Sequence, residues 1–123
     1  MLRLLIVEDA PADAELTIRQ LHSDGIECSW ERVDTEAAFR KALQRTPDLI
    51  ISDGNLPQFD GRVALQIVRA EAPRIPLIFF SGAPWDHRAQ EALEAGAAAF
   101  VCKADRRQLA AVVRRVCGIE AGL

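Results

Sequence analysis

The 123-residue sequence has no long apolar run and no large excess of either charge. No stretch approaches the roughly 18 apolar residues that a membrane helix needs. The first apolar run, Leu4–Val7, ends at Glu8 and Asp9, which is too early for a signal peptide. Acidic and basic residues are interspersed, and the formal net charge is −3. Such a surface is not attracted to nucleic acid or to an anionic membrane. We therefore expect no membrane segment and no direct nucleic-acid partner.

The sequence is also poor in cysteine, with three residues and no Cys-x-x-Cys spacing. Cys28, Cys102 and Cys117 each lie among apolar neighbours, where a free thiol behaves as a small hydrophobic group. We expect reduced cysteines in or near the core of a cytoplasmic protein, rather than a redox or metal site.

Short apolar or alternating segments recur along the chain and alternate with helical patterns. The expected strands are Leu2–Val7, Cys28–Val33, Leu49–Ile51, Leu77–Phe80 and Ala99–Cys102. The first expected helix begins at Pro11 and ends at Asp24-Gly25. The second is capped by Asp34 or Thr35 and the third by Asp60. The fourth lies near 86–95.

The last expected helix begins at Asp105, with Gln108 completing a capping box. Its apolar stripe is the clearest in the chain and comprises Leu109, Val112, Val113 and Val116. Strands and helices alternate five times, which predicts an α/β fold with one doubly wound parallel sheet between two helical layers. Half of the residues are hydrophobic, so such a core can form without disulfides or structural metal. A single domain is expected to fill residues 1–123.

Polar residues follow the expected strands at the points where the strands end. In an open parallel sheet, ligands bind at the carboxyl ends of the strands. The residues at these ends are Glu8 and Asp9 after the first strand, Ser52 and Asp53 after the third, Ser81 and Gly82 after the fourth, and Lys103 after the fifth. The sequence thus predicts that three carboxylates, a hydroxyl and an ammonium converge on one edge.

Three carboxylates so close together need either a raised pKa or a bound cation. Each ionised pair about 4 Å apart would repel by roughly 4 kcal/mol at an effective dielectric of 20. Several hard oxygen ligands without histidine or cysteine favour Mg²⁺ or Mn²⁺ over zinc. Carboxylates, metal, hydroxyl and amine together suit phosphoryl transfer. In this interpretation Asp53 is the nucleophile and forms an acyl phosphate.

Four motifs, in order along the chain, resemble those of the receiver domains of two-component signalling. They are Ile6-Val7-Glu8-Asp9, Asp53-Gly54-Asn55-Leu56-Pro57 with Asp60-Gly61 beyond it, Ser81-Gly82-Ala83, and Lys103. The resemblance extends over essentially the whole chain, and it is to the receivers of the chemotaxis-regulator type. It implies a flavodoxin-like fold with strand order 2-1-3-4-5.

The resemblance also implies a role for each matching residue. Glu8, Asp9, Asp53 and the backbone carbonyl of Asn55 would hold Mg²⁺ or Mn²⁺. Asp53 would be the phosphoacceptor, and Ser81 and Lys103 would bind phosphoryl oxygens. Phe100 would form a conformational switch with Ser81.

The implied partners are those of a signalling switch. The phosphoryl donor would be a histidine kinase or a phosphotransfer protein, and the domain would catalyse only its own phosphorylation and dephosphorylation. The output would be a downstream protein or a covalently linked domain, so the chain is either a stand-alone regulator or one module of a larger sensory or kinase protein. The fourth helix, fifth strand and fifth helix would form the output face and a possible homodimer interface.

One departure from the family pattern keeps an alternative open. Many receivers follow the lysine with proline, whereas here Ala104 follows Lys103. We expect this bond to be trans, which leaves the reach of Lys103 open. The alternative is a receiver-like adaptor that binds a protein partner without phosphorylation. A haloacid dehalogenase-type phosphatase fits less well, because the first strand does not end in Asp-x-Asp. A flavin carrier also fits less well, because Glu8 and Asp9 would repel its phosphate unless a metal ion intervened.

Overall fold

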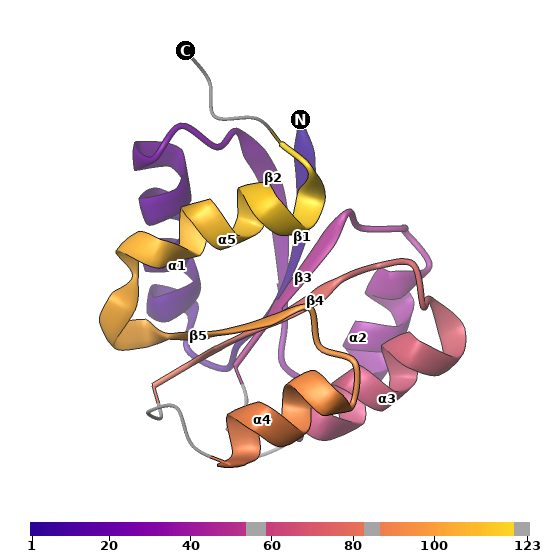
Figure 1. The fold of residues 1–123 in the computed structure, drawn as a ribbon. Coiled ribbons are helices and arrows are strands. Elements are labelled where there is room, and N and C mark those ends of the chain that lie inside the picture. The colour runs from indigo at the N-terminus through magenta and orange to yellow at the C-terminus, as the bar shows by residue number, and fades with distance from the viewer. Residues whose placement is uncertain (54–58, 83–86, 120–123) are drawn as a thin grey trace.

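The five strands form one parallel sheet in the order β2-β1-β3-β4-β5 (Figure 1). The computed structural model describes residues 1–53, 59–82 and 87–119. The strands are β1 (Leu2–Val7), β2 (Cys28–Val33), β3 (Leu49–Ser52), β4 (Leu77–Ser81) and β5 (Ala99–Cys102). The predicted α/β class and strand order are confirmed. β3 and β4 each run one residue further than predicted.

Helices cover both faces of this sheet (Figure 1). They are α1 (Pro11–Ser23), α2 (Glu36–Leu43), α3 (Gly61–Glu71), α4 (His87–Glu94) and α5 (Arg107–Cys117). Residues of α1 and α5 pack on one face, and residues of α2, α3 and α4 pack on the other. The longest described helix, α1, has 13 residues, and none of the described helices has the length and apolar character to span a membrane.

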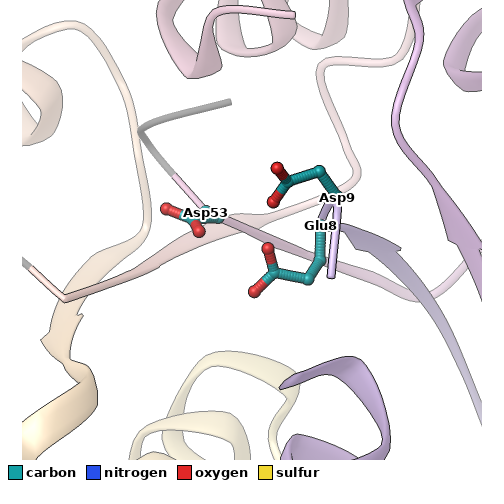
Figure 2. Close-up of side chains that lie close together, drawn as sticks. All are labelled: Glu8, Asp9 and Asp53. Atoms are coloured by element: carbon teal, nitrogen blue, oxygen red, sulfur yellow. The ribbon is translucent and has the colours of Figure 1, made fainter. Parts of the chain in front are cut away.

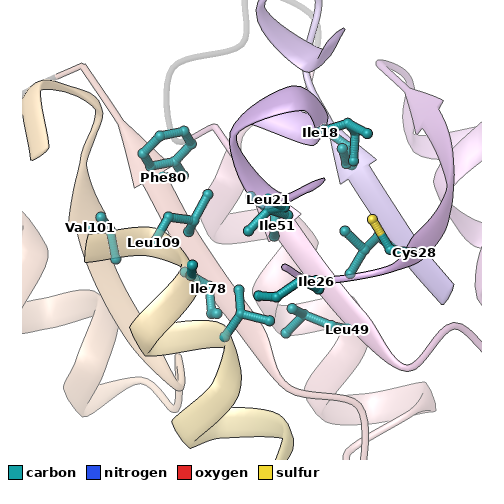
Figure 3. Packing of buried hydrophobic residues seen from close by; sticks show 14 of the residues in the cluster. Ile18, Leu21, Ile26, Cys28, Leu49, Ile51, Ile78, Phe80, Val101 and Leu109 are labelled. Atoms are coloured by element: carbon teal, nitrogen blue, oxygen red, sulfur yellow. The ribbon is translucent and has the colours of Figure 1, made fainter. Parts of the chain in front are cut away.

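The sheet separates two hydrophobic cores. Successive side chains of a strand point to opposite faces, so Leu4 and Ile6 of β1 enter the core beneath α1 and α5, while Leu5 and Val7 enter the other. Figure 3 shows the first of these cores around Leu109. Because β1 and β3 are buried on both faces, they appear in the sequence as continuous apolar runs.

Side chains cap α2 and α3. The Thr35 hydroxyl accepts a hydrogen bond from the Ala38 amide at 3.2 Å, so Thr35 rather than Asp34 caps α2. The Asp60 carboxylate accepts one from the Arg62 amide at 2.8 Å, as predicted for α3. This backbone hydrogen bond lowers the pKa of Asp60 below its ordinary value.

The predicted start of α5 is wrong. Residues Lys103–Asp105 form a 3-10 turn, η1, and α5 begins at Arg107, so the capping box of Asp105 and Gln108 does not form. Arg106, at the N-cap position, already has helical dihedral angles (φ −52°, ψ −31°) and makes no side-chain cap. A capping residue normally has extended dihedrals, and here the chain enters α5 directly from another helical turn. The apolar stripe is confirmed, with Leu109 and Val113 buried.

The three cysteines form no disulfide among the described residues. Cys28 is buried, and Cys102 and Cys117 are half-buried, which confirms the expected core and boundary positions. Burial raises the pKa of the Cys28 thiol.

We predict that Leu109→Ala lowers the free energy of unfolding by about 2–5 kcal/mol, because the side chain is fully buried and its removal leaves a cavity. Urea denaturation measures this loss. Leu16→Ala is the matched control, since Leu16 is 45% exposed on α1, and we expect a change within about 0.5 kcal/mol. Equal losses in the two variants would contradict the assignment of α5 to the core.

We predict that Asp60→Ala lowers the free energy of unfolding by about 1 kcal/mol at pH 7, because the α3 cap is lost. The backbone hydrogen bond from Arg62 holds the folded-state pKa of Asp60 below its ordinary value. Its stabilisation is therefore present above the ordinary pKa and lost as the pH falls through the folded-state pKa. Denaturation midpoints should thus converge with those of the wild type in acid.

Asp105→Ala provides the control for this experiment. Asp105 lies in η1 and is exposed, so its replacement by alanine should change the free energy of unfolding by less than about 0.5 kcal/mol. If Asp105→Ala lowered the free energy of unfolding more than Asp60→Ala does, Asp105 would have to be assigned as a cap of α5 after all.

Candidate functional site

Three carboxylates meet at the carboxyl edge of the sheet. Glu8 and Asp9 follow β1 and Asp53 follows β3, and one carboxylate oxygen of each lies within 4.8 Å of the others (Figure 2). The pairing of β1 with β3 produces this arrangement, because Val7 lies opposite Ser52 and accepts a hydrogen bond from the Asp53 amide at 2.9 Å. Glu8 is buried, Asp53 is partly buried and Asp9 is exposed. This acidic cluster was predicted from the strand ends.

The ammonium of Lys103 enters the acidic cluster from the end of β5. Its Nζ lies 2.7 Å from Glu8 Oε1, 3.3 Å from Asp53 Oδ2 and 3.4 Å from Asp13 Oδ2. The peptide bond after Lys103 is trans, as expected. With this trans bond, Lys103 reaches both Glu8 and Asp53.

The electrostatics of the acidic cluster are dominated by burial and by this lysine. Burial raises the pKa of Glu8 above its ordinary value; the Lys103 ammonium opposes the shift, and the Asp53 carboxylate adds to it. Burial alone would lower the pKa of Lys103. The hydrogen bond to Glu8 and the charges of Asp53 and Glu8 outweigh burial, so the pKa of Lys103 is raised. The lysine is therefore charged across the physiological range.

The donor atoms of the acidic cluster fit a hard divalent cation. Glu8 Oε2 is buried and has no hydrogen-bond partner among the described residues, which is costly for a carboxylate oxygen. All three grouped side chains offer oxygen, the donor type that Mg²⁺ and Mn²⁺ prefer. A cation here would use the orphan oxygen and would offset the repulsion that one lysine leaves uncompensated.

Two other predicted site residues, Ser81 and Phe100, belong to β4 and β5. Ser81 is the buried last residue of β4, opposite Cys102 in the register, so it lies beside the strand end that carries Lys103. Phe100 of β5 is half-buried and packs against the core beneath α2 and α3. Asn55 lies outside the described residues.

Two residues of the site were missed by the sequence analysis. Asp13, in the first turn of α1, is the third carboxylate partner of Lys103. Arg32, next to last in β2, donates from Nη1 to the backbone carbonyl of Glu8 at 3.0 Å and also contacts Asp34 at 3.5 Å. Considering only residues that follow strand ends excludes both. Asp13 could have been found by searching for charged residues within one helical turn of Asp9. Arg32 could have been found by searching the last two residues of β2.

The chain is similar to larger proteins over part of their length. It is 33% identical, over 112 residues, to a protein-glutamate methylesterase/protein-glutamine glutaminase from Anaeromyxobacter dehalogenans, covering 90% of this chain and 32% of that protein. It is 39% identical over 108 residues to another from Syntrophus aciditrophicus, covering 84% of this chain and 30% of that protein. The chain thus spans about a third of the length of these curated relatives.

Solved structures share the fold along nearly the whole chain. The signal receiver domain of the putative response regulator NarL from Mycobacterium tuberculosis superposes with a TM-score of 0.81 at 24% identity, covering 97% of this chain and 98% of that one. The Mn²⁺-bound form of the response regulator Rcp1 has a TM-score of 0.72 at 26% identity, covering 98% of this chain and 92% of that one.

A family model matches most of the chain. The model of the response regulator receiver domain matches residues 4–114. This span runs from within β1 to within α5 and includes the three residues of the acidic cluster and Lys103. The strand order and the register that assembles the cluster agree with this match. The chain therefore belongs to the response regulator receiver domains of two-component signalling.

Proposed function

We propose that this receiver accepts a phosphoryl group on Asp53 in a reaction that depends on Mg²⁺ or Mn²⁺. The observation that carries the proposal is the position of the Asp53 carboxylate. It lies 3.3 Å from the Lys103 ammonium and within 4.8 Å of the carboxylates of Glu8 and Asp9. A nucleophile, a set of metal ligands and a cation for an anionic substrate are thus adjacent.

In this proposal Glu8, Asp9 and Asp53 hold the metal ion, together with the backbone carbonyl of Asn55. The orphan Oε2 of Glu8 supports their assignment, as does the description of the similar Rcp1 as a Mn²⁺-bound form. When bound, the ion supplies positive charge that offsets the charge on the phosphoryl oxygens.

The proposed transfer is a displacement at phosphorus. One carboxylate oxygen of Asp53 forms a bond to the phosphorus atom while the bond between phosphorus and the donor's histidine nitrogen breaks, and the nitrogen keeps the electron pair. Lys103 and Ser81 bind phosphoryl oxygens as the group moves. Hydrolysis of the resulting acyl phosphate returns Asp53 to a carboxylate.

The proposed partners lie at the input and the output of this reaction. The donor is a histidine kinase or a phosphotransfer protein of the cytoplasm. Ser81 and Phe100 transmit the modified state to the α4–β5–α5 face, which binds a downstream protein, a linked output domain or a second copy of the chain. Residues 1–123 act as one receiver module in this scheme. The family match and the longer relatives support it.

We predict that acetyl phosphate with Mg²⁺ adds the mass of one phosphoryl group to the wild-type chain and none to Asp53→Asn. Intact-mass spectrometry measures the gain, and EDTA should abolish it. Asp48→Asn is the matched control, because Asp48 lies at the opposite end of β3 and accepts a hydrogen bond from the Arg3 amide. If the wild type gains no mass and binds no Mg²⁺, the phosphorylation-independent adaptor becomes the better explanation.

We predict that Lys103→Met slows phosphorylation by acetyl phosphate at least about tenfold, because a preorganised cation for the phosphoryl oxygens is lost. Metal binding should respond differently. Since the ammonium competes with a metal for Glu8 and Asp53, the affinity for Mn²⁺ should stay equal or increase. Mass spectrometry over time and a Mn²⁺ titration separate the two effects. Weaker Mn²⁺ binding would show instead that Lys103 organises the ligands.

A further inference from the structure

Both polar groups of the Glu8 backbone are held by the end of β2. The Glu8 amide donates to the Val33 carbonyl at 3.0 Å, and the Glu8 carbonyl accepts from Arg32 Nη1 at 3.0 Å. The first bond continues the pairing of β1 with β2. The second is a side-chain contact, and it depends on an arginine at this position.

The carbonyl that Arg32 contacts belongs to the peptide that joins Glu8 to Asp9. A peptide unit is planar, so a hydrogen bond to its oxygen restrains the backbone on both sides of the bond. The two side chains on that backbone belong to the acidic cluster. A guanidinium donor to a carbonyl is a charge-assisted hydrogen bond, stronger than one between neutral groups.

The position of Arg32 suits a restraint of this kind. Its side chain is 29% exposed, and Asp34 contacts the same Nη1 at 3.5 Å. The carboxylate of Asp34 partly offsets the positive charge and helps to fix the guanidinium. Arg32 is thus tied to the peptide between two metal ligands without being a ligand itself.

We propose that Arg32 is a positioning residue for metal binding, acting through its hydrogen bond to the Glu8 carbonyl. The inference rests on the proposed function, since it concerns the affinity of the acidic cluster for Mg²⁺ or Mn²⁺. Charge alone predicts the opposite effect: removal of a positive charge beside a cation site would strengthen cation binding. Weaker cation binding in an Arg32 variant would therefore show that Arg32 positions the metal ligands.

The experiment is a Mn²⁺ titration followed by electron paramagnetic resonance of the free ion, on the full chain. We expect Arg32→Met to weaken Mn²⁺ binding about tenfold, the lower end of the usual effect of removing an outer-shell partner. Arg45→Met is the matched control. Arg45 forms an ion pair with Glu31, the neighbour of Arg32 in β2, but contacts no residue of the acidic cluster among the described residues. Its Mn²⁺ affinity should equal that of the wild type.

A second readout separates positioning from a general loss of structure. In phosphorylation by acetyl phosphate, the half-saturating Mg²⁺ concentration should rise about tenfold in Arg32→Met, while the rate at saturating Mg²⁺ stays within about twofold. If Arg32→Met does not fold, Arg32→Lys replaces it. Lysine keeps the charge but ends one bond shorter with a single nitrogen, and we expect about threefold weaker Mn²⁺ binding.

The outcomes distinguish this inference from the proposed function. A wild-type chain that binds Mn²⁺, with an Arg32 variant that binds it equally well or more tightly, overturns the role of Arg32 alone. A wild-type chain that binds no Mn²⁺ overturns both. A parallel loss in Arg45→Met would also overturn the inference, because it would trace the effect to β2 as a whole.

Discussion

The structure around the site depends on a balance of charge at one edge of the sheet. Three carboxylates lie within 4.8 Å of one another, and Glu8 among them is buried. Each ionised pair at about 4 Å costs roughly 4 kcal/mol at an effective dielectric of 20, which is a large fraction of the 5–15 kcal/mol that typically stabilises a whole domain. The Lys103 ammonium offsets part of this repulsion. The remaining negative charge makes the same edge attractive to a divalent cation.

This balance requires the complete sheet, because its partners are far apart in sequence. Lys103 and Glu8 are separated by 95 residues, and their contact depends on the pairing of β1 with β3, of β3 with β4 and of β4 with β5. Burial on both faces fixes where the strands lie, and the charged side chains of the site follow directly after the strand ends. Stability and function are therefore opposed at Glu8, just beyond β1, where one carboxylate oxygen is buried without a hydrogen-bond partner among the described residues.

The sequence was most informative where one local signal decided the outcome. Continuous apolar runs located β1, β3, β4 and β5, and Pro11 correctly marked the first residue of α1. The acidic cluster followed from strand ends in a parallel sheet. The start of α5 could not be obtained in this way, because the 3-10 turn of 103–105 follows from how the chain leaves β5, and the capping pattern at Asp105 does not reflect it. Asp13 and Arg32 were missed because their roles depend on where a helical turn and a neighbouring strand lie in space.

The alternation along β1 limits how chains of this kind can vary in length. Leu4 and Ile6 belong to one core and Leu5 and Val7 to the other, and Glu8 follows directly. Inserting or deleting one residue within the strand would exchange these side chains between faces and would move the carboxylate away from Lys103. Substitutions inside β1 that preserve size leave this arrangement intact, whereas a change of length leaves it intact only in a connection such as the one between α2 and β3. The distance along the chain between the buried residues of β1 and the Glu8 carboxylate is therefore fixed by the packing of the sheet.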